Sequence, residues 1–212
     1  MRDLKCHACG EDATLLYAGP GKLFACALHW TGSKVDWQAV PTVQLIKGSL
    51  LDAMHQIEAK LPILLTAARV WNSLDVNYEP PHVERLWHQY DDNYRLYLHR
   101  IHPCNEALFH PHPWPSAVHI LSGSYEMGIG YGEGSKQPPV AATLTLRGGS
   151  EYEMIEPNGW HYVRPLAGPS LSIMVTGQPW QRWSPSPSTK LGPLKAEVFA
   201  ELLESFRSFF RP

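Results

Sequence analysis

Hydrophobic positions divide this 212-residue chain into a strand-rich part and two helical segments. From residue 93 to residue 176, short apolar runs alternate with turns that contain glycine or proline, a spacing typical of an antiparallel sandwich or barrel. Eight strands are expected there, at residues 94–101, 107–110, 116–121, 125–131, 143–147, 152–155, 161–165 and 170–176. The pattern therefore predicts a mainly β domain.

Helical periodicity lies on both sides of these strands. Residues 49–61 carry an apolar stripe at helical spacing, and Pro62 is placed to end that helix. Residues 195–210 carry a second stripe, which indicates a helix that packs on the strands or on a second subunit, so a homodimer is expected. Between the first helix and the strands, residues 67–71 are expected to form a strand and residues 83–90 a short helix.

Four segments follow from these patterns. Residues 1–40 form a small cysteine-containing segment, and residues 41–92 form a mixed, partly helical connector. Residues 93–178 form the strand-rich domain. Residues 179–212 form a proline-rich tail that leads into the last helix.

Composition and charge narrow the classes of partner. The formal net charge is −2 and the basic residues are scattered, so neither nucleic acid nor an anionic membrane surface is expected as a partner. The longest apolar run, residues 61–68, is too short to span a bilayer, and no apolar core follows the charged N-terminus. A cytoplasmic protein is the expectation.

Three of the four cysteines fall in the first 26 residues, in a spacing typical of a structural zinc site. Two pairs of ligands, each separated by two residues, flank short strands expected at residues 15–17 and 22–25. The expected zinc ligands are Cys6, Cys9, Cys26 and His29. A redox pair or a disulfide would also use a C-x-x-C sequence, but a redox pair needs neither the third cysteine nor the histidine, and a disulfide framework suits a secreted chain.

A second group of metal-ligand residues lies inside the strand-rich part. His110 and His112 are two residues apart, which in an extended strand places both imidazoles on one face. His161 ends the run Pro-Asn-Gly-Trp-His about fifty residues later. Imidazole is the commonest side-chain ligand of metals, so these three residues indicate a mononuclear metal site within the β domain.

These residues resemble the two motifs of the cupin superfamily, whose fold is a jelly-roll barrel. The resemblance covers about residues 93–176. In the first motif a histidine pair is followed by a glutamate and a glycine; Gly123 matches the glycine, and Ser116 stands at the glutamate position. The second motif ends in P-x-G-x-x-H, which residues 157–161 match with one residue fewer. The resemblance implies a metal held by His110, His112 and His161.

Cupins that lack the glutamate and keep three histidines include thiol dioxygenases related to cysteine dioxygenase. The similarity implies Fe(II), or another divalent metal, with open positions for substrate and dioxygen. A fourth ligand would be either water or His119, whose register favours an outward direction. The residues expected around the substrate are Arg100, Trp114, Ser116 and Trp160.

Further polar residues near the motif leave more than one assignment open. A substrate carboxylate would suit an arginine, and either Arg95 or Arg164 could take that role in place of Arg100. His99, His102 and Glu106 precede the first motif and lie either at the barrel mouth or on the surface.

Three functions are compatible with such a site. The first is a non-haem Fe(II) dioxygenase that acts on a small polar substrate. The second is a non-catalytic cupin, a metal-stabilised sensor or binding module. The third is a metal-dependent isomerase or hydrolase that uses the same pocket with another divalent ion.

Overall fold

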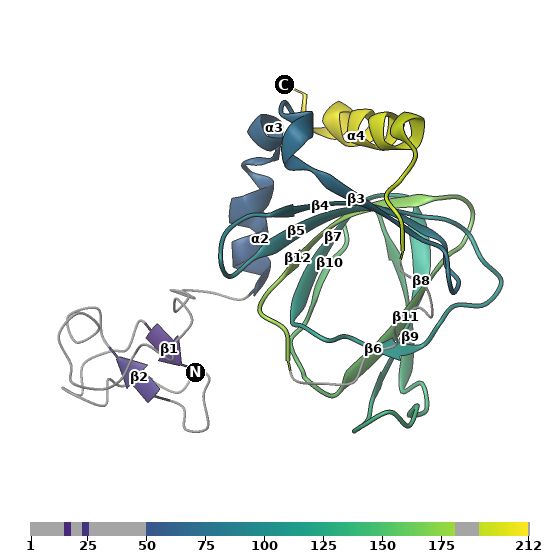
Figure 1. Cartoon of the computed structure of the whole chain (residues 1–212). Helices are drawn as coiled ribbons and strands as arrows, with labels where there is room; N and C mark the ends of the chain where they lie inside the picture. Colours follow the sequence, from purple (N-terminus) through teal and green to yellow (C-terminus); the bar gives the residue numbers. More distant parts are fainter. Residues whose placement is uncertain (1–14, 18–22, 26–49, 181–190, 212) are drawn as a thin grey trace. The chain divides into compact units, whose positions relative to one another are not determined.

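The computed structural model describes residues 15–17, 23–25, 50–180 and 191–211, and contacts divide the chain into units of residues 1–49 and 50–212 (Figure 1). In the first unit, β1 (Leu15–Tyr17) pairs antiparallel with β2 (Leu23–Ala25), which confirms the short strands expected there. The expected zinc ligands lie outside the described residues, and so does most of the proline-rich tail.

The described part of the second unit contains two antiparallel sheets. The six-stranded sheet has the order β10-β7-β12-β5-β4-β3, and the four-stranded sheet has the order β6-β11-β8-β9. The bounds of the first sheet are β3 (Asn72–Val76), β4 (Val83–Gln89), β5 (Arg95–Ile101), β7 (Ser116–Ser122), β10 (Glu151–Met154) and β12 (Ser170–Thr176). Those of the second are β6 (His110–Pro111), β8 (Ser124–Tyr131), β9 (Ala142–Arg147) and β11 (Gly159–Pro165). The expectation of a mainly β domain is confirmed.

Two expected elements differ in type from the structure, and the strand expected at residues 107–110 is reduced to β6 (His110–Pro111). Residues 83–90, expected to be helical, form β4, which pairs with β3 on one side and β5 on the other. Residues 67–71, expected to be a strand, contain the short 3₁₀ helix η2 (Ala68–Val70). The interpretation of β4 was wrong because polar and apolar residues occur on both of its faces, so the strand shows no clean alternation.

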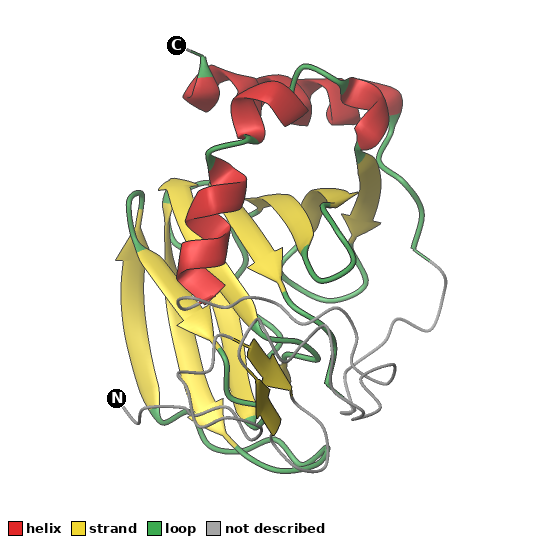
Figure 2. Ribbon diagram, turned by 90° about the vertical axis from the view of Figure 1, so that its left-hand side faces the viewer, coloured by secondary structure: helices red, strands yellow, loops and turns green. Residues whose placement is uncertain are grey.

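Helices cover the outer face of the six-stranded sheet (Figures 1 and 2). They are α2 (Leu50–Glu58), α3 (Leu61–Leu64) and α4 (Ala196–Phe210). The helices expected at residues 49–61 and 195–210 are confirmed, although Pro62 lies in the first turn of α3, where a proline is tolerated. Among the described residues, no helix is long and apolar enough to cross a membrane.

The main hydrophobic core lies between these helices and the sheet. Alternate residues of each strand point to it, such as Leu96 and Leu98 on β5 and Ile173 on β12. They meet apolar side chains of the helices, including Met54 and Phe206, all without measurable exposure. The intervening residues of the same strands point the other way, between the two sheets, where they line a cavity.

Candidate metal centre

Strand pairing brings the three motif histidines together. β6 lies beside β11, and the register places His110 opposite His161. His112 follows two residues after His110, and its ring centroid lies 4.3 Å from that of His161 and 5.9 Å from that of His110. One ligand nitrogen from each of the three histidines lies within 4.8 Å of the others. The histidines that the sequence analysis selected therefore converge on one point.

Hydrogen bonds orient two of these rings. Nδ1 of His110 lies 2.9 Å from the carbonyl oxygen of Leu108, so Nδ1–H donates there and Nε2 keeps its lone pair. Nδ1 of His112 lies 2.9 Å from Oγ of Ser116, a hydroxyl that can accept in the same way. Nδ1 of His161 is buried without a hydrogen-bond partner. Two oriented rings and one buried nitrogen without a partner fit the binding of a divalent metal.

The environment favours the neutral form of the His161 and His110 rings. Burial lowers the pKa of His161 well below its ordinary value, and the neighbouring His112 and His110 lower it further. Burial also lowers the pKa of His110, with a smaller lowering from Arg85, although the Leu108 carbonyl opposes this. Because only the unprotonated imidazole binds a metal, this environment favours metal binding at neutral pH.

The three histidines form part of the wall of a cavity of about 240 Å³ between the sheets. Apolar and aromatic side chains supply most of the remaining lining, and Arg85 and His99 are its other basic residues. The lining side chains that a substrate could contact include Tyr78, Arg85, His99, Trp114, Val118, Tyr125, Tyr152, Ser172 and Met174. A small organic molecule can therefore occupy the space beside the histidines.

The expected substrate residues fall in different places. Trp114 lines the cavity and stacks on Tyr97, with ring centroids 6.4 Å apart. Ser116 is fully buried beside His112 and is not part of the lining. Trp160 points away from the cavity; it packs on Phe109 at 5.8 Å and donates Nε1–H to the Gly132 carbonyl.

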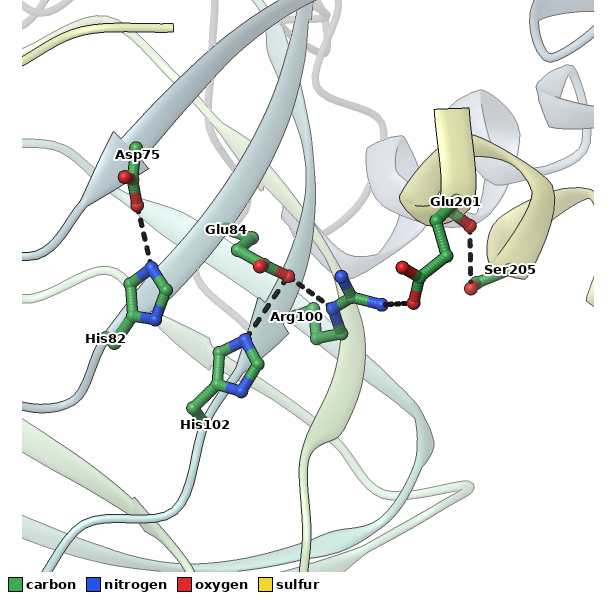
Figure 3. A network of polar contacts seen from close by, with 7 residues as sticks. All are labelled: Asp75, His82, Glu84, Arg100, His102, Glu201 and Ser205. Atoms are coloured by element: carbon green, nitrogen blue, oxygen red, sulfur yellow. Dashed lines mark hydrogen bonds and ion pairs between the residues drawn. The ribbon is translucent and has the colours of Figure 1, made fainter. Parts of the chain in front are cut away.

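Arg100 lies on the outer face of the sheet. Its guanidinium is paired with Glu84 of β4 and with Glu201 of α4, and His102 also contacts Glu84 at 3.2 Å (Figure 3). Neighbouring residues of β5 face opposite ways, so Arg100 points away from the cavity while His99 points into it. The structure does not bring Arg100 together with the three histidines.

His119, Arg95 and Arg164 also lie away from the three histidines. His119 points outward and lies 2.9 Å from Glu58 of α2, in agreement with the outward register and away from the metal ligands. Arg95 contacts Gln89, and Arg164 pairs with Glu126; neither arginine lines the cavity.

Sequence reasoning missed Arg85. Its strand was interpreted as a helix, so no inward face was assigned to it. Val83, Arg85 and Trp87 share one face of β4, and Glu84 and Leu86 share the other, but each face mixes polar and apolar residues, so no alternation marks Arg85 as inward. His99 was considered for the barrel mouth and lies in the cavity.

No family model and no curated protein match this chain. Solved structures that resemble it include hydroxypropylphosphonic acid epoxidase from S. wedmorenis, with 17% identity over 52% of this chain and 56% of the epoxidase, at a TM-score of 0.42. An RmlC-like cupin from Shewanella frigidimarina has 11% identity over 53% of this chain and 87% of its own, at a TM-score of 0.40. KdgF from Halomonas sp. has 14% identity over 52% of this chain and 88% of its own, at a TM-score of 0.39. The chain thus spans a little over half of the epoxidase's length.

Proposed function

We propose that this chain is a metal-dependent cupin that acts as a non-haem Fe(II) dioxygenase on a small organic substrate. One observation carries the proposal: the three imidazoles converge, within 4.8 Å of one another, on the wall of a cavity that can hold such a substrate. His110, His112 and His161 would hold the metal.

The ligand set favours a reactive metal centre, as the proposed iron site requires, over a closed structural site. Within the described part of the chain the cluster contains three histidines and no carboxylate or thiolate, and such a set leaves coordination positions open. When bound there, Fe(II) supplies redox chemistry with dioxygen. Ser116 would support this ligand set, because a hydrogen bond between its hydroxyl and Nδ1 of His112 orients the His112 ring.

The cavity lining would protect the reaction from bulk water. Trp114, Val118 and Met174 present apolar surface beside the histidines, and the last two are almost fully buried. An apolar surround lowers the local dielectric constant and strengthens the interactions of charged groups in the site. These residues would therefore hold a substrate against the metal and exclude solvent.

Metal analysis combined with oxygen uptake tests the proposal. The full chain would be purified without added metal, and its iron and zinc content would be measured. Iron near one equivalent in the cavity, together with oxygen uptake stimulated by a panel of small thiols and small acids, supports the dioxygenase. Zinc near one further equivalent would support the expected N-terminal site at Cys6, Cys9, Cys26 and His29.

Two results would count against this function. Zinc alone at two equivalents would contradict an iron enzyme. A cavity metal without oxygen uptake in the presence of any panel compound would favour the metal-stabilised binding module instead. Loss of iron from the variant His110→Ala, with the fold retained, would link the iron to these three histidines.

A further inference from the structure

Three polar side chains form a row across neighbouring strands of the cavity wall. Arg85 of β4 lies opposite His99 of β5, and His99 lies opposite Ser172 of β12. Residues opposite one another in paired strands point to the same face, and all three line the cavity. The row therefore offers several hydrogen-bond donors to one bound group.

Arg85 is a cation without a carboxylate partner inside the described part of the chain. Its Nε is buried and lacks a hydrogen-bond partner, and its guanidinium lies over the Tyr97 ring at 5.0 Å. Glu79 lines the cavity as well, but it is exposed and forms no ion pair with Arg85. Burial lowers the pKa of Arg85, with Tyr97 and Tyr78 opposing, yet a guanidinium stays charged. A partly buried cation of this kind is stabilised by a bound anion.

Two more nitrogen atoms in the same cavity lack partners. They are Nε2 of His99 and Nε1 of Trp114, and both are buried. The indole nitrogen is a donor only, and neutral His99 carries one N–H. Burial, then Arg85 and His112, lower the pKa of His99 well below its ordinary value, so its ring stays neutral. These donors match a group that carries several acceptor oxygens.

A second row, two residues along the same strands, is aromatic and apolar. Tyr97 lies opposite Met174, Met174 opposite Val118, and Val118 opposite Tyr152. Two residues of a strand span about 6.8 Å, so a single small molecule can contact both this row and the polar row. Trp114 stacks on Tyr97 and extends the apolar surface. A second charge would be poorly solvated here, whereas an apolar body would be well packed.

We infer that the cavity binds a small organic acid whose carboxylate is held by Arg85, with His99 and Trp114 as further donors, and whose apolar body lies on Val118, Tyr152 and Met174. This inference deepens the proposed function, on which it rests for the role of the cavity as a substrate site. It replaces the expected small polar substrate by an amphipathic acid.

Binding of three probes by calorimetry to the full chain as purified tests the inference. The probes are 3-phenylpropanoate, its primary amide and acetate. The amide keeps the apolar body without the charge, and acetate keeps the charge without the body. We expect 3-phenylpropanoate to bind at least about tenfold more tightly than either of the others, because only it uses both rows.

Variants of the two rows assign the effect. Arg85→Gln should lower the affinity for 3-phenylpropanoate at least about tenfold, to a value close to that for the amide. Arg85→Lys should retain part of the affinity. Met174→Gln should weaken 3-phenylpropanoate and leave acetate unchanged. Arg164→Gln removes the same charge from outside the cavity and should change nothing. Circular dichroism and the melting temperature of each variant confirm that it is folded.

Equal affinity for the acid and the amide, or unchanged affinity in folded Arg85→Gln, would overturn the inference. Binding of acetate as tight as that of 3-phenylpropanoate would overturn the apolar part of it. The same titration after removal of metal with a chelator separates this question from the proposed function. If 3-phenylpropanoate still binds to the metal-free protein, and binding still depends on Arg85, the acid subsite is supported even when the protein contains no iron or takes up no oxygen.

Discussion

The two faces of the six-stranded sheet are built in opposite ways. The outer face, under α2 and α4, is a dry core in which Leu86, Leu98 and Ile173 are fully buried among helix side chains. The inner face leaves a cavity of about 240 Å³ and carries polar nitrogens without protein partners, those of Arg85 and His99 among them. Each fully buried apolar side chain contributes about 1.5–3 kcal/mol to stability, whereas a buried polar group without a partner costs about 1–3 kcal/mol.

This difference separates stability from chemistry within single strands. On β12, Ile173 packs under the helices and the next residue, Met174, lines the cavity. Apolar burial on the helix-covered face can offset the loss of stability caused by the cavity and the unpaired polar groups of the inner face. The inner face can therefore retain space and hydrogen-bond donors for a ligand. Substitutions on the two faces should therefore affect different properties.

The largest effect is expected from loss of a metal ligand on the cavity side. His161→Ala should weaken binding of the cavity metal by at least about 100-fold, since removal of a ligand exceeds the effect of its supporting contacts. His119→Gln is the control on the outer face, where His119 contacts Glu58. Metal content after dialysis measures both. Equal loss of metal from the two variants would contradict the separation of the faces.

Adjacent residues of β12 test stability directly. Ile173→Ala should lower the free energy of unfolding by about 2–5 kcal/mol, because it opens a void in the close-packed outer core. Met174→Ala should cost less, because its side chain already borders open space. Chemical denaturation at a fixed metal content gives both values. An equal cost for the two substitutions would mean that the cavity face is as important for stability as the core.

A smaller effect is expected from the support of a ligand. Ser116→Ala removes the hydroxyl that lies 2.9 Å from Nδ1 of His112, and metal affinity should fall about 10–100-fold while all three ligands remain. Competition with a chelator measures the change. Ser116→Thr keeps a hydroxyl and serves as the matched control. Unchanged affinity in Ser116→Ala would show that packing alone orients the His112 ring.

The smallest effect concerns the polar network on the outer face. Burial raises the pKa of Glu84, but the hydrogen bond from Arg100 and the contact with His102 outweigh this, so the pKa is lowered overall. The ionised carboxylate therefore stabilises the fold above the ordinary pKa of glutamic acid, and this stabilisation is lost as the pH falls through the lowered value. Glu84→Gln should destabilise the protein most at neutral pH and least in acid.

Unfolding free energies of the wild type and of Glu84→Gln, measured across the acidic range, check this dependence. Glu201→Gln is the comparison, because the side chain of Glu201 is 67% exposed and its pair with Arg100 is worth little. A difference between the wild type and Glu84→Gln that stays constant with pH would exclude an electrostatic role for Glu84.

The cluster of three histidines could be predicted from the sequence because local spacing determines it. Two histidines two residues apart share a face of any strand, and His161 comes with its own turn residues. The role proposed for Arg85 could not be predicted from the sequence, because the position of Arg85 depends on the pairing of β4 with β3 and β5 in the sheet. Trp160 was assigned to the cavity because it is next to His161, yet adjacent residues of a strand face opposite ways.

One consequence follows from where the histidine pair sits in its sheet. β6 is a two-residue edge strand, paired only with β11 among the described strands, and it carries His110 while His112 follows directly. An edge strand this short has few backbone hydrogen bonds to hold it. A metal shared with His161 would fasten that edge to its neighbour. Occupancy of the site would then govern how often the cavity wall opens locally at this edge.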